Sequence, residues 1–206
     1  MPPAHTPRRR PATPTTNTPT TNTPTTTRPS STAKPHLWGP AMWNLLFSIA
    51  FRADPDRHAN VLQALQDLRH ALPCSECRAS FSEFCRHVPP PERANALPQW
   101  LWKCKDAVNH KLGQKSPRFE KIKQRYALFA VTTSERALVD LVGVCCDADA
   151  DATRVRSALY HLLTAAQSIL SRRFCDLALE NLPSADATDA ASLRAYARGL
   201  RAVRFG

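Results

Sequence analysis

The sequence predicts an all-α protein, and three observations carry this prediction. Glycine is rare, with five residues in a chain of 206. Apolar residues recur three and four positions apart along much of the chain, which is the spacing of one helix face. Alternating apolar runs joined by hairpin turns, the pattern of β-sheets, are not found. With 43% hydrophobic residues, the chain can bury one compact core and a smaller second one.

Residues 1–34 differ in composition from the rest of the chain. The sequence TPTTN at residues 13–17 is followed by near-copies at 18–22 and 23–27. This tail has almost no apolar side chains whose burial could offset the entropy of ordering, so we expect it to be disordered. It lacks the apolar segment of a secretory signal, and its prolines are incompatible with the amphipathic helix of a transit peptide.

Residues 35–130 are predicted to form a first domain, which starts with three helices. The first follows Gly39-Pro40, and its apolar stripe requires a packing partner. The second starts near Asp54-Pro55 and repeats apolar residues at helical spacing. The third begins at the motif CSEC and ends at the proline run 89–91.

Two further helices complete this predicted domain. The fourth runs from Pro98 to Gly113, with a proline at its entry and a glycine at its exit. The fifth is short and covers about 118–129. These segments together indicate a bundle of four or five helices.

Residues 131–206 are predicted to form a smaller C-terminal helical extension. Its helices are expected at 133–146, at about 152–182 and at about 188–203. The acidic loop at 147–151 lacks the glycine and the glutamate that a calcium-binding loop requires, so we interpret it as a solvated linker.

Cys74 and Cys77 are the strongest chemical signal in the sequence. Two cysteines three positions apart at a helix start can cycle between a dithiol and a disulfide. The helix N-terminus carries about half a positive charge, which favours thiolate over thiol. Pro73 is expected at the first helical position. The pattern therefore predicts redox chemistry on thiols, with Cys74 and Cys77 as catalytic residues.

The chain is strongly basic, with a net charge of +11 at pH 7. Five basic residues lie in the tail before the first acidic residue, Asp54. A second cluster, from Lys103 to Arg125, holds eight Lys or Arg and could bind a pyrophosphate or face solvent. Because it lacks interleaved aromatic residues and a reading helix, nucleic-acid binding is not favoured. No run of about 18 apolar residues occurs, so no membrane span is expected.

The predicted fourth helix carries a further group of side chains suited to a ligand. Trp102, Lys105, Asp106 and Asn109 fall three, one and three positions apart. This spacing places an aromatic ring, a cation and two hydrogen-bonding groups on one stripe of the helix. Such a face suits a planar, polar ligand.

The order of three motifs extends this interpretation. WGPAMW stands at 38–43, CSEC at 74–77 and VNHKLG at 108–113. With these motifs, the stretch from about Lys34 to Phe129 resembles the Erv/ALR-type FAD-linked sulfhydryl oxidases. The resemblance implies a flavin-binding helical bundle, usually a homodimer, with FAD as its cofactor.

The activity that the resemblance implies is thiol oxidation. A thiolate of a client protein attacks the disulfide at Cys74 and releases Cys77, which lies beside the flavin and reacts with it. Cys74 then re-forms the disulfide, and the electron pair passes through FAD to O2, which gives H2O2. The implied partners are thiol-containing client proteins and molecular oxygen.

The resemblance also implies a set of FAD contacts, located on WGPAMW, on the predicted first helix after it, and on the predicted fourth and fifth helices. These are Trp38, Trp43, Phe47, Lys105, Asp106, Val108, Asn109, Lys111, Lys121 and Tyr126. Phe47 stands where the family usually has His, Lys105-Asp106 replace a usual His-Asn, and Tyr126 replaces a usual Trp.

The remaining cysteines and two aromatic residues are also interpreted through the resemblance. Trp102 and Phe119 occupy the positions of a usual structural disulfide, and an aromatic contact between them could partly replace it. Cys85 and Cys104 lie on successive helices, where they either pair or stay as buried thiols. A possible shuttle pair would come from Cys145, Cys146 and Cys175, although packing inside helices is an alternative role for them.

Two alternatives to a flavin oxidase remain open from the sequence. Cys74 and Cys77 with Cys85 and either His87 or Cys104 could form a zinc site, although the second half of that site is poorly spaced. A helical scaffold without flavin is the other alternative. The C-terminal extension also resembles the layout of sulfhydryl oxidases of large DNA viruses. We expect an intracellular location: host cytoplasm or virion for a viral protein, or the mitochondrial intermembrane space for a cellular one.

Overall fold

The computed structural model describes residues 35–128, 131–147 and 150–205. Within these ranges it contains nine α-helices and no strand, which confirms the all-α prediction. The predicted disordered tail lies outside the described residues. The helices are α1 (Pro35–Arg52), α2 (His58–Ala71), α3 (Ser75–His87), α4 (Leu97–Lys111), α5 (Phe119–Ala127), α6 (Val131–Asp147), α7 (Ala152–Ala165), α8 (Arg172–Glu180) and α9 (Ala190–Phe205).

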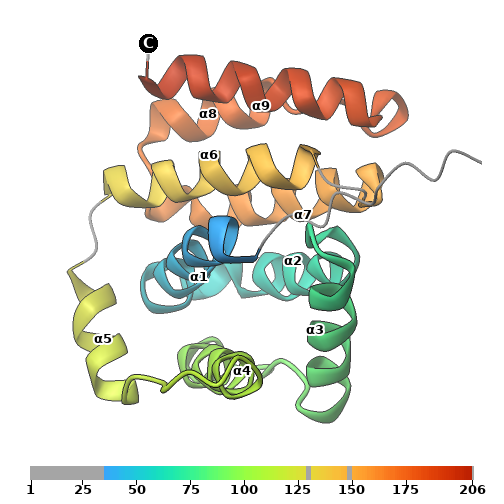
Figure 1. The fold of residues 1–206 in the computed structure, drawn as a ribbon. Coiled ribbons are helices and arrows are strands. Elements are labelled where there is room, and N and C mark those ends of the chain that lie inside the picture. The colour runs from blue at the N-terminus through green and yellow to red at the C-terminus, as the bar shows by residue number, and fades with distance from the viewer. Residues whose placement is uncertain (1–34, 129–130, 148–149, 206) are drawn as a thin grey trace, which may run out of the picture. The chain divides into compact units, whose positions relative to one another are not determined.

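The described helices belong to one compact unit. In Figure 1, α1 and α2 lie between two groups of helices, α3 to α5 on one side and α6 to α9 on the other. The most extensive packing joins α2 to α7 and α1 to α6, and α9 covers α6. The C-terminal extension therefore shares a core with the first two helices.

Helix α1 is the centre of this core. Its side chains are buried on several faces, with Leu45 and Phe47 at 0% exposure and Ile49 at 1%. A helix that is apolar around its circumference requires partners on opposite sides. The two groups of helices around α1 and α2 supply those partners.

Helix α1 begins earlier than the sequence predicted. It starts at Pro35, and Pro40 lies inside it, whereas the prediction placed its start after Gly39-Pro40. Pro40 costs one backbone hydrogen bond near the helix start. The extra turn contains Trp38, which is 3% exposed, so burial of this large ring offsets the lost bond.

The predicted long helix from about 152 to 182 is wrong, because the structure divides it into two. Helix α7 ends at Ala165, a 3-10 turn covers Ala166–Ser168, and α8 starts at Arg172. Glu135 of α6 accepts a hydrogen bond from the Ser171 backbone N–H at 3.0 Å. This contact satisfies a donor at the start of α8 and stabilises the break.

Other predicted boundaries agree closely with the structure. Helix α3 ends at His87, before the proline run, and Gly113 follows α4 with a φ of 66°. That left-handed conformation suits glycine, which has no Cβ. Within the described residues, no helix combines the length and the apolar character that crossing a bilayer requires.

Candidate redox site

Cys74 and Cys77 are joined by a disulfide at the start of α3. Cys74 is the N-cap residue, and its Sγ accepts a hydrogen bond from the Cys77 backbone N–H at 3.2 Å. The prediction that Pro73 is the first helical residue is wrong, because Pro73 precedes the N-cap. A cap must have non-helical backbone, which Cys74 adopts with φ of −110° and ψ of 128°.

The two sulfur-bearing residues differ in exposure and in their contacts with the helix. Cys74 is 5% exposed, whereas Cys77 is partly buried. The N–H group and the positive end of the helix dipole both act on Cys74 Sγ. In the reduced state this arrangement favours a thiolate on Cys74.

Arg78 attaches the start of α3 to the loop before the disulfide. Its Nη1 donates a hydrogen bond to the carbonyl oxygen of Leu72 at 2.6 Å, and its backbone N–H donates to the carbonyl of Cys74 at 3.0 Å. A positive charge is therefore held beside the redox pair. Arg78 was not predicted as a site residue, although its place directly after CSEC was the available signal.

Three of the implied FAD contacts form one aromatic cluster. The ring centroids of Phe47 and Tyr126 lie 5.1 Å apart, and those of Trp43 and Phe47 lie 6.1 Å apart. The Tyr126 hydroxyl donates a hydrogen bond to Asn44 Oδ1 at 2.6 Å. Burial raises the pKa of Tyr126, so the hydroxyl stays a donor at neutral pH. Asn44 was missed, and its polarity within an apolar stretch was the signal.

Lys105 adds a cation to this cluster. Its Nζ lies 5.0 Å from the centroid of a Trp43 ring. Burial, followed by the nearby positive charge of Arg125, lowers the pKa of Lys105. Within the described residues Lys105 has no acidic partner. An anionic group beside Lys105 would stabilise its protonated form and raise its pKa again.

Two more of the implied contacts lie at the end of α4, and one of them, Lys111, reaches α3. Lys111 Nζ donates a hydrogen bond to Ser80 Oγ at 2.7 Å, one helical turn after Cys77. Asn109 is 6% exposed, and its Nδ2 donates to Ser116 Oγ at 3.0 Å. The VNHKLG motif and the redox helix are therefore neighbours.

The other implied FAD contacts do not belong to the aromatic cluster. Trp38 is buried in the core, and Val108 is partly buried against it. Asp106 and Lys121 are exposed, and the structure brings neither of them into the aromatic cluster.

An aromatic contact stands where the family usually has a structural disulfide. The rings of Trp102 and Phe119 lie 6.1 Å apart in an edge-to-face arrangement, with 63° between their planes. Trp102 Nε1 also donates a hydrogen bond to the carbonyl of Pro117 at 2.9 Å. The contact suggested for this pair is therefore present, and it connects α4 to α5.

The remaining five cysteines, Cys85, Cys104, Cys145, Cys146 and Cys175, are buried. Burial raises the pKa of Cys85 and of Cys175 to about 11, and it also raises those of Cys104 and Cys145. A buried and protonated thiol is a poor nucleophile. The burial of the C-terminal cysteines is compatible with packing inside helices, and a shuttle role for them stays a prediction.

The zinc alternative finds no support in the geometry. Cys74 and Cys77 are engaged with each other, and in the described ranges no three His, Cys, Asp or Glu side chains gather where they could hold a metal ion. The chemistry of the implied contacts fits FAD better, because they offer aromatic rings, a lysine without an acidic partner among the described residues and the buried amide of Asn109.

A disulfide between two cysteines at a helix start, within a helical bundle, is the arrangement expected of a thiol redox protein. Residues 40–127 match the model of the Erv1 / Alr family, so this part of the chain is similar to an Erv/ALR-type domain. The resemblance seen in the sequence is thereby confirmed. Comparison with curated proteins and with solved structures found no match.

Proposed function

We propose that this protein is an FAD-dependent thiol oxidase that forms disulfide bonds in client proteins. The observation that carries the proposal is the Cys74–Cys77 disulfide, capped onto α3, inside the segment that matches the Erv1 / Alr family. The aromatic and cationic residues of α1, α4 and α5 support a flavin as the acceptor of the electrons.

The residues that would hold FAD come from α1, α4 and α5. Trp43 and Tyr126 offer aromatic surface, Lys105 offers a positive charge for a phosphate, and Asn109 and Lys111 offer hydrogen-bond donors close to α3. When bound, FAD accepts the electron pair of the reduced cysteines and transfers it to O2, which leaves as H2O2.

The cysteine pair carries out the thiol exchange. A client thiolate attacks Cys74 Sγ, the Cys74–Cys77 bond breaks, and Cys77 leaves as a thiolate. A second client thiolate then attacks the client sulfur of this mixed disulfide and releases Cys74 as a thiolate. The client has lost two electrons, and the cysteine pair has gained them.

The N-cap geometry supports Cys74 as the sulfur that exchanges with the client. The leaving thiolate of the second step is Cys74, and the Cys77 N–H donates to this sulfur. A stabilised leaving thiolate accelerates the exchange. Because Cys74 is 5% exposed, the client must displace covering side chains to reach it.

The test is the visible absorption spectrum of the full-length protein, before and after addition of dithiothreitol in air. We expect a flavin band near 450 nm that bleaches with the dithiol and recovers as O2 is consumed, together with H2O2 production. Cys77→Ala should abolish turnover, whereas Cys85→Ala, at a buried free thiol, should retain it.

A colourless protein that does not take up added FAD would contradict the oxidase proposal. That result would favour the alternative of a helical scaffold that keeps the disulfide but has no flavin. The family usually forms homodimers, so we also propose a dimer, which light scattering of the purified protein tests through its molar mass.

A further inference from the structure

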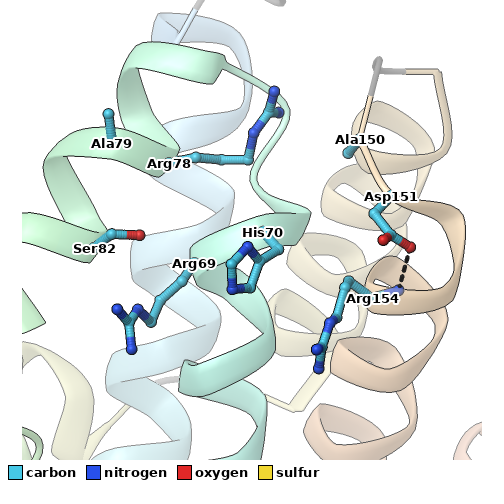
Figure 2. A pocket seen from close by; sticks show the side chains of 8 residues that line it. All are labelled: Arg69, His70, Arg78, Ala79, Ser82, Ala150, Asp151 and Arg154. Carbon is cyan, nitrogen blue, oxygen red and sulfur yellow. Dashed lines mark hydrogen bonds between the residues drawn. The ribbon is translucent and has the colours of Figure 1, made fainter.

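A basic cavity lies beside the redox pair and outside the implied flavin contacts. It has a volume of about 490 Å³. Figure 2 shows that its lining side chains come from α2, from α3 and from the start of α7. The polar side chains in this lining are Arg69, His70, Arg78, Ser82, Asp151 and Arg154.

The charge of the lining is positive. Three guanidinium groups face one carboxylate, that of Asp151, which already caps α7 by accepting a hydrogen bond from the Arg154 N–H at 3.1 Å. Asp67, behind Arg154, is likewise engaged with Arg154 and Ser157. The acids near the cavity are therefore occupied by contacts of their own, and the cavity favours an anion.

Arg69 provides a second and independent observation. Its Nε is buried and has no hydrogen-bond partner within the described part of the chain. A buried donor without an acceptor destabilises the folded state, so such groups are uncommon in folded proteins. A carboxylate or phosphate oxygen would satisfy it, because guanidinium groups bind these oxyanions with paired hydrogen bonds.

The small amount of apolar surface in the lining indicates which anions would bind poorly. Among the described residues, Ala79 and Ala150 alone contribute apolar side chains to the cavity, and its lining contains no Phe, Tyr or Trp; the one aromatic ring is the small imidazole of His70. A nucleotide or a flavin requires a surface on which its rings can stack. The cavity therefore suits a compact oxyanion such as the carboxylate of an aspartate or glutamate.

The position of the cavity connects this anion to the redox chemistry. Arg78 lines the cavity, and its guanidinium is held at the carbonyl of Leu72, two residues before Cys74. Two residues of extended chain span at most about 7 Å. An extended polypeptide with its carboxylate at Arg78 could therefore reach the redox pair with a cysteine about two to four residues away.

We propose that this cavity binds an acidic residue of a client polypeptide and thereby places a nearby client cysteine at Cys74. Recognition of the acidic segment stands on the cavity alone, whereas oxidation of that cysteine rests on the proposed oxidase function. The protein would then oxidise thiols in acidic segments in preference to those in neutral or basic segments.

The binding test uses the full-length protein and three labelled peptides of equal length, each with serine in place of the client cysteine. The residues around the serine are Asp and Glu, Asn and Gln, or Lys, and fluorescence anisotropy at low salt measures the affinity. We expect the acidic peptide to bind at least tenfold more tightly than the amide peptide, and the lysine peptide to bind least.

Arg69→Gln should weaken binding of the acidic peptide about tenfold, because it removes the buried donor and its charge. Arg69→Lys, which keeps the charge, should fall between Arg69→Gln and the unchanged protein. The matched control is Arg172→Gln on α8, at a side chain that is 96% exposed. Thermal unfolding of each variant separates lost binding from lost folding.

Three results would overturn the proposal. They are equal affinity for the acidic and amide peptides, equal effects of Arg69→Gln and Arg172→Gln in folded proteins, and displacement of the acidic peptide by inorganic phosphate at lower concentration than by the unlabelled peptide. The last result would make the cavity a site for a free anion. Because the serine peptides cannot be oxidised, this binding assay gives its answer even if the oxidase proposal fails.

The activity arm uses the same peptides with cysteine restored. The ratio of kcat/KM for the acidic peptide to that for the amide peptide should exceed ten, and Arg69→Gln should bring it close to one. A ratio near one in the unchanged protein would mean that the cavity does not select clients. A protein without turnover on any peptide would instead contradict the proposed oxidase function.

Discussion

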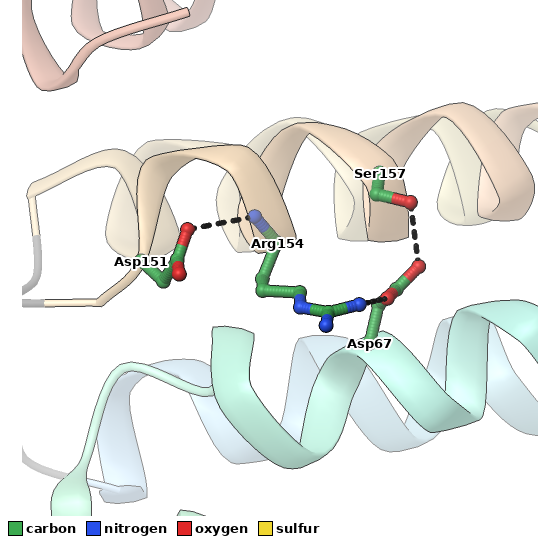
Figure 3. Close-up of polar contacts among 4 residues, drawn as sticks. All are labelled: Asp67, Asp151, Arg154 and Ser157. Atoms are coloured by element: carbon green, nitrogen blue, oxygen red, sulfur yellow. Dashed lines mark hydrogen bonds and ion pairs between the residues drawn. The ribbon is translucent and has the colours of Figure 1, made fainter. Parts of the chain in front are cut away.

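The carboxylate of Asp67 on α2 accepts a hydrogen bond from the Arg154 side chain on α7 at 3.0 Å (Figure 3). Ser157 of the same helix donates to the second oxygen at 2.6 Å. The Asp67 side chain is fully buried, whereas 51% of the Arg154 side chain is exposed. The interface between the first helices and the C-terminal extension is therefore held by a buried charge as well as by apolar packing.

Asp67→Asn should destabilise the protein by about 2 kcal/mol. The substitution removes the charge and turns an amide N–H₂ toward groups that donate, and the exposure of Arg154 keeps the loss below that of a fully buried ion pair. Urea unfolding measures the difference. Asp176→Asn, at an exposed pair with Arg172 whose atoms are 3.7 Å apart, should change stability by less than about 0.5 kcal/mol. Equal effects of the two variants would refute the structural role of Asp67.

The Trp102–Phe119 contact should show energetic coupling. Trp102→Leu, Phe119→Leu and the double variant form a cycle in which each single change removes the edge-to-face contact. We expect a coupling energy of about 1 kcal/mol from urea unfolding, which is the usual value for an aromatic pair beyond its burial. Additive effects within about 0.3 kcal/mol would show that the two rings only fill space.

Cys74 and Cys77 should differ in thiol exchange. In the Cys77→Ser variant, Cys74 remains as a free thiol at the N-terminus of α3. This thiol should form a mixed disulfide with oxidised glutathione at pH 7 about tenfold faster than the Cys77 thiol of the Cys74→Ser variant. Mass spectrometry of the modified peptides gives both rates. Faster reaction at Cys77, the more exposed residue, would assign the client-facing role to that cysteine instead.

Lys105 should contribute to flavin binding if the oxidase proposal is right. Lys105→Gln removes the charge over Trp43 and is expected to weaken FAD binding about fivefold, or about 1 kcal/mol. Lys103→Gln, at an exposed lysine on the same helix, is the matched control. Quenching of flavin fluorescence during titration of the apoprotein measures both affinities. Equal affinities would exclude Lys105 from the site.

Cys85 should make stability fall at alkaline pH. Its pKa is raised from 9.0 to about 11 by burial in the folded state, so between these values the unfolded chain loses the thiol proton and the folded chain keeps it. The unfolding free energy therefore decreases as the pH rises through this window. Cys85→Ala should lose less stability than the unchanged protein between pH 9 and 11, as measured by thermal unfolding. Parallel losses would contradict a buried, protonated Cys85.

Much of the fold and part of the candidate site could be predicted from local patterns. Apolar spacing, the proline run after His87 and the glycine after α4 identified most helices because these signals act within one or two turns. The pairing of Trp102 with Phe119 was also anticipated, since the resemblance placed both at neighbouring positions. The Erv1 / Alr match covers these same helices.

The parts that could not be predicted depend on contacts between distant segments. Asn44 meets Tyr126 across 82 positions, and Lys111 meets Ser80 across 31. The spacing of residues along one helix does not predict contacts between distant segments, so these hydrogen bonds could be identified only from the tertiary structure. The basic cavity is of the same kind, because Arg69, Arg78 and Arg154 belong to three different helices.

The sequence by itself determined the helical class, the position of the CSEC pair at a helix start and the similarity of residues 40–127 to the Erv1 / Alr family. These properties rest on residue type and on spacing along one helix, both of which are written in the chain. Only the tertiary structure decided that α7 ends at Ala165, because Glu135 of α6 supplies an acceptor to the start of α8. It also decided that Asp67 is buried, since a charge leaves water only when distant donors such as Arg154 and Ser157 replace its hydration.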